Sequence, residues 1–234
     1  MPMSNLTIVL LPGLDGTGHL FEFLVPTLPP YSRPFVVSYP NELFLDYTDL
    51  QSYASGIIPA TERFVLLGES FSGPIALNIA STARKNLVAV ILVATFVKNP
   101  LSRIVSWVCY ILGASLFRLP IPSSFIRKIL LGKNSPENLV NTFLNVLQSV
   151  DPKILAYRLR SVLNVDVRQA LLNCSVPILY LLPTRDKVVA KSSFDVILNL
   201  RHDIEVTLID APHMLLQCEP LIASQAIDNF LRQL

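Results

Sequence analysis

Charged side chains are scarce in this chain of 234 residues. Asp, Glu, Lys and Arg together make up 15% of the residues, whereas apolar residues make up 51%. The formal net charge of +2 is small, so we expect no nucleic-acid partner. The length fits one domain with room for an inserted segment. The apolar excess indicates either a large core or a surface that faces a hydrophobic ligand.

Cysteine is also scarce. Cys109, Cys174 and Cys218 are odd in number and show no paired spacing, so the sequence predicts neither a disulfide framework nor a zinc motif. The first apolar run meets Pro12 and Gly13 too early for a secretory signal peptide. No run reaches the roughly 18–20 apolar residues that span a bilayer. These absences favour a cytoplasmic, reducing location.

Short apolar runs alternate with helix-like segments. The predicted strands are Thr7–Leu11, Pro34–Tyr39, Phe64–Leu67, Val88–Ala94, Pro177–Leu182 and Ile204–Ile209. The predicted helices are His19–Thr27, Tyr47–Ile57, Ser72–Ala83, Lys191–Leu200 and Leu221–Leu234. The strands are apolar along their whole length, which is typical of a parallel sheet covered on both faces. The alternation predicts an α/β fold with a doubly wound, mainly parallel sheet.

One segment interrupts this alternation. More than seventy residues of mostly helical pattern separate the fourth and fifth predicted strands. We therefore divide the chain into a core, residues 1–96 and 171–234, and an inserted helical cap, residues 97–170. Ligands bind at the carboxyl ends of the strands in such sheets, and we expect the cap to cover that edge.

A serine stands at the sharpest predicted turn. Gly68-Glu69-Ser70-Phe71-Ser72 follows the third strand and precedes a helix. Small residues two positions either side of Ser70 allow strand and helix to approach closely, and the helix N-terminus points at the hydroxyl. A serine presented in this way is usually a nucleophile.

A serine hydroxyl needs a base to take its proton, and the base needs an orienting acid. His213 follows the last strand, at the sheet edge where we expect Ser70, whereas His19 and His202 suit structural or solvated positions. Asp186 follows the fifth strand and is the predicted acid, with Asp210 as the alternative. The order Ser, Asp, His is that of serine hydrolases with this architecture.

Acyl chemistry also needs donors for the developing oxyanion. The first strand leads into a loop with glycines at 13, 16 and 18, where backbone amides can approach a ligand closely. The amides of Leu14 and Phe71 are the predicted pair of donors. The glycine spacing is not that of a dinucleotide site, and no Walker lysine follows, which disfavours a nucleotide-binding loop.

With these motifs in order, the chain resembles α/β-hydrolase fold serine hydrolases of the esterase-like, cap-bearing kind over nearly its whole length. It departs from their G-x-S-x-G motif in having Ser72 at the last position. It also has Pro12-Gly13 where relatives often carry His-Gly, and it begins at the strand equivalent to their third. The resemblance implies no metal and no organic cofactor.

An uncharged segment, Ile104–Phe117, lies in the predicted cap between Arg103 and Arg118. As a helix its fourteen residues would rise about 21 Å, too little to cross a membrane. It is either a buried cap helix or an interfacial lid. We expect Trp107 in this segment, and Phe96 before it, to contact a hydrophobic substrate.

Positive charge is concentrated around the same segment. Residues 98–170 hold ten Lys or Arg against three Asp or Glu, a balance of +7, and the remainder of the chain has nine against fourteen, a balance of −5. The cations are Lys98, Arg103, Arg118, Arg127, Lys128, Lys133, Lys153, Arg158, Arg160 and Arg168. They are either ordinary solvated charges or a surface for an acidic acyl carrier protein or an anionic membrane. Small carrier-protein ester esterases of the resembled family offer a precedent for the carrier.

The sequence thus predicts a serine hydrolase that cleaves a carboxylic ester or thioester with a hydrophobic acyl part. An acyltransferase and an acyl-carrier-protein ester esterase would use the same three residues. A non-catalytic binding protein of the same fold is the alternative from another class.

Overall fold

The structure is a computed structural model, and it describes residues 6–59, 61–82, 84–102, 106, 110–118 and 121–234. Six parallel strands form one sheet in the order β2-β1-β3-β4-β5-β6. They are β1 (Leu6–Leu11), β2 (Ser32–Val36), β3 (Phe64–Glu69), β4 (Leu87–Val93), β5 (Ile178–Pro183) and β6 (Glu205–Ile209). All six predicted strands therefore form, and the predicted doubly wound, parallel α/β sheet is confirmed.

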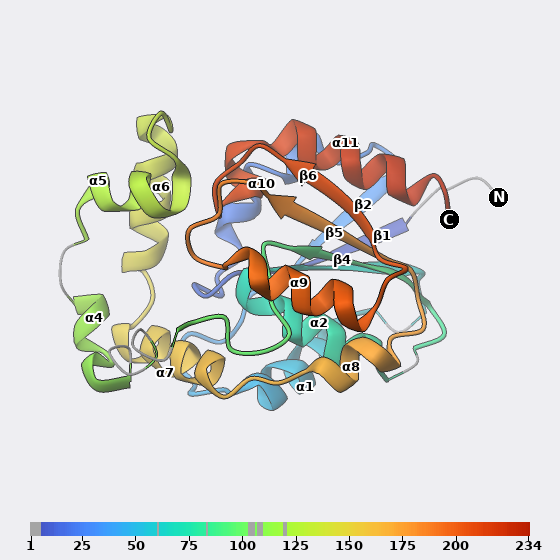
Figure 1. The fold of residues 1–234 in the computed structure, drawn as a ribbon, viewed down its shortest axis with the longest axis horizontal. Helices are drawn as coiled ribbons and strands as arrows, with labels where there is room; N and C mark the ends of the chain where they lie inside the picture. Colours follow the sequence, from blue (N-terminus) through green and yellow to red (C-terminus); the bar gives the residue numbers. More distant parts are fainter. Residues whose placement is uncertain (1–5, 60, 83, 103–105, 107–109, 119–120) are drawn as a thin grey trace.

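Helices cover both faces of the sheet (Figure 1). One face carries α1 (Tyr47–Ile57), α2 (Gly73–Ala80), α8 (Arg168–Asn173) and α9 (Lys191–Leu200). The other face carries α11 (Pro220–Leu231), with the short α10 (Leu215–Cys218) before it. Side chains of the two central strands β3 and β4 alternate between two buried clusters, one on each face, which explains why these strands are apolar at every position.

The first predicted helix is wrong in type. His19–Thr27 is not one α-helix but two short 3₁₀ turns, η1 (His19–Glu22) and η2 (Val25–Thr27). Pro26 lies in the second turn and has no backbone N–H to donate, so an α-helix cannot continue through it. The edge strand also differs from the predicted Pro34–Tyr39. Strand β2 begins two residues earlier, at Ser32, and ends at Val36.

Helices fill most of the described chain between β4 and β5. They are α4 (Ser115–Arg118), α5 (Ser123–Ile126), the π-helical turn η4 (Arg127–Leu131), α6 (Glu137–Gln148) and α7 (Pro152–Leu163), followed by α8. The helices α4 to α7 lie beyond the carboxyl ends of the strands (Figure 1). The amide of Val167 donates to Val97 O at 2.7 Å, so the chain leaves and re-enters the core at neighbouring points. We call residues 97–167 the helical insertion, because α8 already packs against α2 and α9.

Among the described residues, no helix is both long and apolar enough to cross a bilayer.

The close contact of β3 with α2 depends on Gly68. A Cβ at this position would lie 2.8 Å from Ser72 O and 2.9 Å from the Cβ of Ala76, both too close. We expect Gly68→Ala to destabilise the fold by about 1–3 kcal/mol, as overpacking does. Urea unfolding measures this. Gly56→Ala is the matched control, because nothing lies within 4 Å of a Cβ there and Gly56 is helical. It should be neutral or stabilising by up to about 1 kcal/mol; equal midpoints for the two variants would contradict the contact argument.

Candidate active site

Ser70 lies on a strained turn directly after β3. Its φ of 47° places a residue with a side chain in the left-handed region, which is costly outside glycine. Thr95, which follows β4, supports this backbone: its hydroxyl donates to Ser70 O at 2.5 Å. The Thr95 main chain is in turn held by the Tyr180 hydroxyl, which donates to Thr95 O at 2.8 Å. Hydrogen bonds from Thr95, directly after β4, and from Tyr180, in the neighbouring strand β5, thus stabilise the strained backbone of Ser70.

Ser72, at the last position of the motif, has a structural environment of its own. It is fully buried, and its hydroxyl donates to Pro12 O after β1. The Tyr39 hydroxyl lies 2.7 Å from Ser72 Oγ. A glycine at 72 could not make these bonds, so this departure from the common motif connects the turn to the loop that follows β1.

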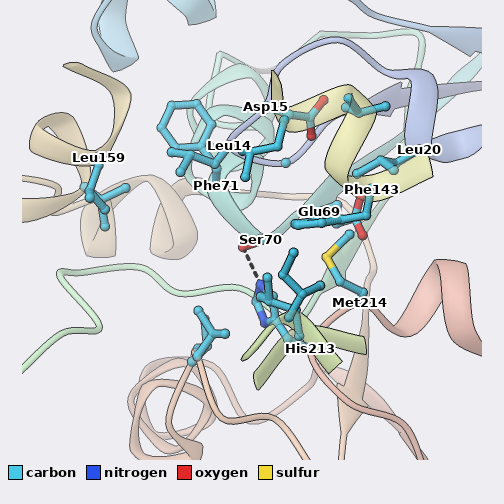
Figure 2. A pocket seen from close by; sticks show the side chains of 18 of the residues that line it. Leu14, Asp15, Leu20, Glu69, Ser70, Phe71, Phe143, Leu159, His213 and Met214 are labelled. Atoms are coloured by element: carbon cyan, nitrogen blue, oxygen red, sulfur yellow. Dashed lines mark hydrogen bonds between the residues drawn. The ribbon is translucent and has the colours of Figure 1, made fainter. Parts of the chain in front are cut away.

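Three predicted side chains form one hydrogen-bonded chain. Ser70 Oγ lies 2.9 Å from His213 Nε2, and His213 Nδ1 lies 2.8 Å from Asp186 Oδ2 (the first bond is dashed in Figure 2). An ionised carboxylate can only accept, so Nδ1 carries the proton and Nε2 presents a lone pair to the serine. The other Asp186 oxygen accepts from the amides of Val188 and Val189, which fixes the carboxylate. His213 is buried, with 5% of its surface exposed.

The alternatives considered for these roles lie elsewhere. Asp210 is on the surface, where its carboxylate pairs with Arg185 at 2.7 Å. His19 and His202 are exposed.

The two predicted oxyanion donors flank Ser70. Leu14 and Phe71 both line the cavity into which the serine opens, and Figure 2 shows both near it. Among the described residues, the amide of Leu14 donates to no backbone acceptor. Phe71 lies in the single 3₁₀ turn Ser70–Ser72, and the first backbone N–H groups of a helix have no partner within it. Phe71 packs in the core, stacked on Tyr47 with ring centroids 4.9 Å apart.

A buried arginine from the helical insertion holds the loop around Leu14. Arg158, on α7, is 2% exposed and donates to Leu14 O at 3.2 Å and Asp15 O at 2.6 Å. It also donates to Pro40 O and to the side chain of Asn41. Gly16, with φ 71°, must be glycine here, because a Cβ would lie 2.3 Å from the guanidinium. Burial lowers the pKa of Arg158 from its ordinary value.

The burial of Arg158 shows that one residue of the predicted basic surface was assigned wrongly. Arg158 is enclosed and cannot contact a carrier protein or a membrane. Two other predicted cations are paired on the surface, Arg168 with Asp166 at 2.6 Å and Arg127 with Glu137. A role for the remaining cations in binding an anionic partner stays a prediction, and Arg103 lies outside the described residues.

The cavity at Ser70 has a volume of about 240 Å³ and is almost entirely apolar. The core supplies Phe96, one of the two predicted substrate contacts, together with Leu20, Val189 and Met214. The insertion supplies the opposite wall. Its lining residues include Phe117, Ile121, Phe125, Ile126, Leu130, Phe143, Val146, Leu147, Leu159 and Val162. Trp107, the other predicted substrate contact, lies outside the described residues.

Sequence reasoning overlooked two acidic groups in this cavity, Asp15 and Glu69, which are 8% and 4% exposed. The Asp15 carboxylate is satisfied within its own loop, because Oδ2 accepts from the amide and the hydroxyl of Thr17. For Glu69 a signal was present, since it is the one charged residue in an otherwise apolar strand. Burial raises the pKa of Glu69 to about 7.

Solved structures share this architecture. The enol-lactonase from Burkholderia xenovorans LB400 matches with a TM-score of 0.84 at 14% identity, covering 98% of this chain and 92% of that one. An esterase from Exiguobacterium antarcticum matches with a TM-score of 0.82 at 18% identity and the same coverage. A lipase-esterase related protein from Clostridium acetobutylicum ATCC 824 matches with a TM-score of 0.78 at 16% identity, covering 97% and 95%.

The chain has the α/β-hydrolase fold. Since identities below about a fifth show the fold alone, the chemistry of this α/β-hydrolase scaffold has to be argued from its own residues. No protein-family model and no curated protein matches the sequence.

The contribution of the Arg158 hydrogen bonds to the free energy of unfolding can be measured. Arg158→Met keeps the length of the side chain and removes every donor, which leaves buried carbonyls without partners. We expect a loss of at least about 2 kcal/mol in the free energy of unfolding. Arg160→Met, on the same helix but exposed over the Tyr110 ring, should change it by less than about 0.5 kcal/mol. Similar urea midpoints for both variants would show that the buried bonds contribute nothing.

Proposed function

We propose that this chain is a serine hydrolase that cleaves carboxylic esters with a hydrophobic acyl part. The observation that carries the proposal is the hydrogen-bonded chain Ser70–His213–Asp186 at the wall of an apolar cavity. The resemblance in fold to an esterase and a lipase-esterase related protein supports the same class of reaction.

In the proposed reaction, Ser70 Oγ attacks the ester carbonyl carbon while His213 Nε2 takes the hydroxyl proton. Asp186 accepts from Nδ1 and stabilises the imidazolium that forms. The carbonyl oxygen becomes an oxyanion, for which the amides of Leu14 and Phe71 are the donors. The imidazolium then protonates the leaving alcohol, and an acyl-enzyme remains on Ser70.

The second half repeats these roles with water. His213 removes a proton from a water molecule, whose oxygen attacks the acyl carbon. The second tetrahedral intermediate collapses, Ser70 recovers its proton and the carboxylic acid leaves. A thioester follows the same steps with a thiol as the leaving group.

The composition of the cavity indicates the substrate class. Apolar side chains line both of its walls, and the acidic groups Asp15 and Glu69 line the same cavity as Ser70. An acyl chain gains free energy from burial against such walls, whereas a substrate carboxylate would meet negative charge. We further propose that the helical insertion is a cap that forms the acyl-binding wall.

The nucleophile is tested with a fluorophosphonate probe and an ester substrate. Ser70→Ala should abolish labelling and lower kcat for p-nitrophenyl butyrate by at least about 1,000-fold. Ser72→Ala keeps the proposed nucleophile and should still be labelled. Circular dichroism and thermal unfolding verify that both variants fold. Full ester turnover by folded Ser70→Ala would refute the proposed mechanism.

The acyl-binding wall is tested with a series of p-nitrophenyl esters of increasing acyl length. Each added methylene should raise kcat/KM by up to about four-fold until the cavity is filled, from about 0.8 kcal/mol per buried methylene. Val146→Phe, which fills the cavity from α6, should shorten the preferred acyl chain and leave acetate hydrolysis unchanged. Asn145→Phe, exposed on the same helix, should leave the profile unaltered. A flat profile in the unmodified protein would contradict an acyl-binding role.

A further inference from the structure

Glu69 is a buried carboxyl group for which the proposed reaction has no role. It ends β3 directly before Ser70, is 4% exposed and lines the same cavity as Ser70 and His213. Figure 2 shows it beside Ser70 and Met214. Its hydrogen bond comes from Gln217 on α10, whose Nε2 donates to Glu69 Oε1 at 3.0 Å. A buried ionisable group with one such partner costs stability when charged, so its presence calls for an explanation.

The groups around this carboxyl come from several elements. Asp15, from the loop after β1, adds a like charge and raises the pKa of Glu69 further. The Gln217 hydrogen bond and His213 lower it, but burial outweighs both, and the pKa lies at about 7. The thiol of Cys218, next to Gln217 in the chain, is half-buried. Burial raises its pKa, and the Glu69 charge raises it further. Both protonation states of Glu69 are therefore populated near neutral pH.

Gln217 favours the ionised form of Glu69. Its Nε2 donates to the carboxyl group, and a carboxylate accepts such a bond more strongly than a neutral acid does. The Oε1 of Gln217 is the one buried side-chain oxygen or nitrogen without a hydrogen-bond partner in the part of the chain that the structure describes. Gln217 therefore opposes the effect of burial on the pKa of Glu69 without cancelling it.

We propose that Glu69 is a positioning residue that acts through His213: its ionised carboxylate stabilises the imidazolium that forms when Ser70 attacks the ester. This inference rests on the proposed function. Two negative groups then act on the same ring, Asp186 through a hydrogen bond to Nδ1 and Glu69 through the field in a cavity of low dielectric. Protonation of Glu69 removes the second contribution without disturbing the first.

The pH dependence follows from the sign of the charge. Above about pH 7 Glu69 is ionised and assists, and below it the carboxyl is neutral and the assistance is lost. Glu69→Gln keeps the shape, accepts the same bond from Gln217 and can never be charged. We expect the ratio of kcat, unmodified protein over Glu69→Gln, to be near one at pH 5.5 and about five to ten at pH 8.5. The substrate is p-nitrophenyl butyrate.

Gln217→Met is the second variant. It removes the hydrogen bond that favours the ionised carboxyl, so the rise in activity with pH that depends on Glu69 should move to higher pH. A purely structural role of Glu69 would produce neither this displacement nor a ratio that depends on pH. A ratio that is equal at every pH, or a midpoint unmoved by Gln217→Met, would overturn the proposal.

Unfolding by urea gives a readout that is independent of turnover. The folded pKa of Glu69 is raised above its ordinary value of 4.5, so its favourable contribution is complete below pH 4.5 and is lost as pH rises through about 7. Glu69→Gln should therefore unfold at a higher urea midpoint than the unmodified protein at pH 8.5, with the difference shrinking towards pH 5. A midpoint difference that does not change with pH would contradict a titrating Glu69.

Fluorophosphonate labelling distinguishes a failure of the proposed role of Glu69 from a failure of the proposed function. Labelling of Ser70 with a flat kcat ratio would reject the role of Glu69 alone, and absence of labelling in the unmodified protein would reject the proposed function and this inference with it.

Discussion

The site depends on one tight turn. Strand β3 ends and α2 begins within a few residues, so Ser70 must adopt a left-handed backbone, and Gly68 must lack a side chain for the two elements to fit. The strain is offset by hydrogen bonds from outside the turn: Thr95 to the Ser70 carbonyl and Ser72 to the loop after β1. Neither bond involves a group that we propose to react. The position of the serine oxygen is thus a property of three neighbouring strands rather than of the local sequence alone.

What could be predicted from the sequence is what a local pattern encodes. Buried strands are apolar at every residue, and a parallel sheet brings their carboxyl ends to one edge, so Ser70, Asp186 and His213 could be expected to meet there although 143 residues separate the first from the last. The predicted helix over His19–Thr27 was wrong because apolar spacing does not report the effect of Pro26. Arg158 could not be singled out, since nothing in its neighbourhood along the chain distinguishes it from nine other cations. Its role is set by carbonyl groups more than 110 residues earlier.

The cavity combines two environments that work against each other. Aliphatic and aromatic side chains from both the core and the helical insertion exclude water, which strengthens every electrostatic interaction inside. The same exclusion makes the buried acid Glu69 difficult to ionise and raises its pKa to about 7. Asp15 differs in its partners, because its carboxylate accepts hydrogen bonds from the amide and the hydroxyl of Thr17 within its own loop. Glu69, in contrast, can take up a proton near neutral pH and so become neutral inside the apolar cavity.

The short connection at Val97 and Val167 has a consequence for how this scaffold can change. Both ends of the helical insertion meet at one point, so a different set of helices could be grafted between them without altering the sheet. The graft would have to preserve bonds between the insertion and the core, above all those of the α7 guanidinium to the carbonyl groups of Leu14 and Asp15. An exchange of the insertion between scaffolds of this fold would therefore have to keep Arg158 together with the loop that contains Leu14, Asp15 and Gly16.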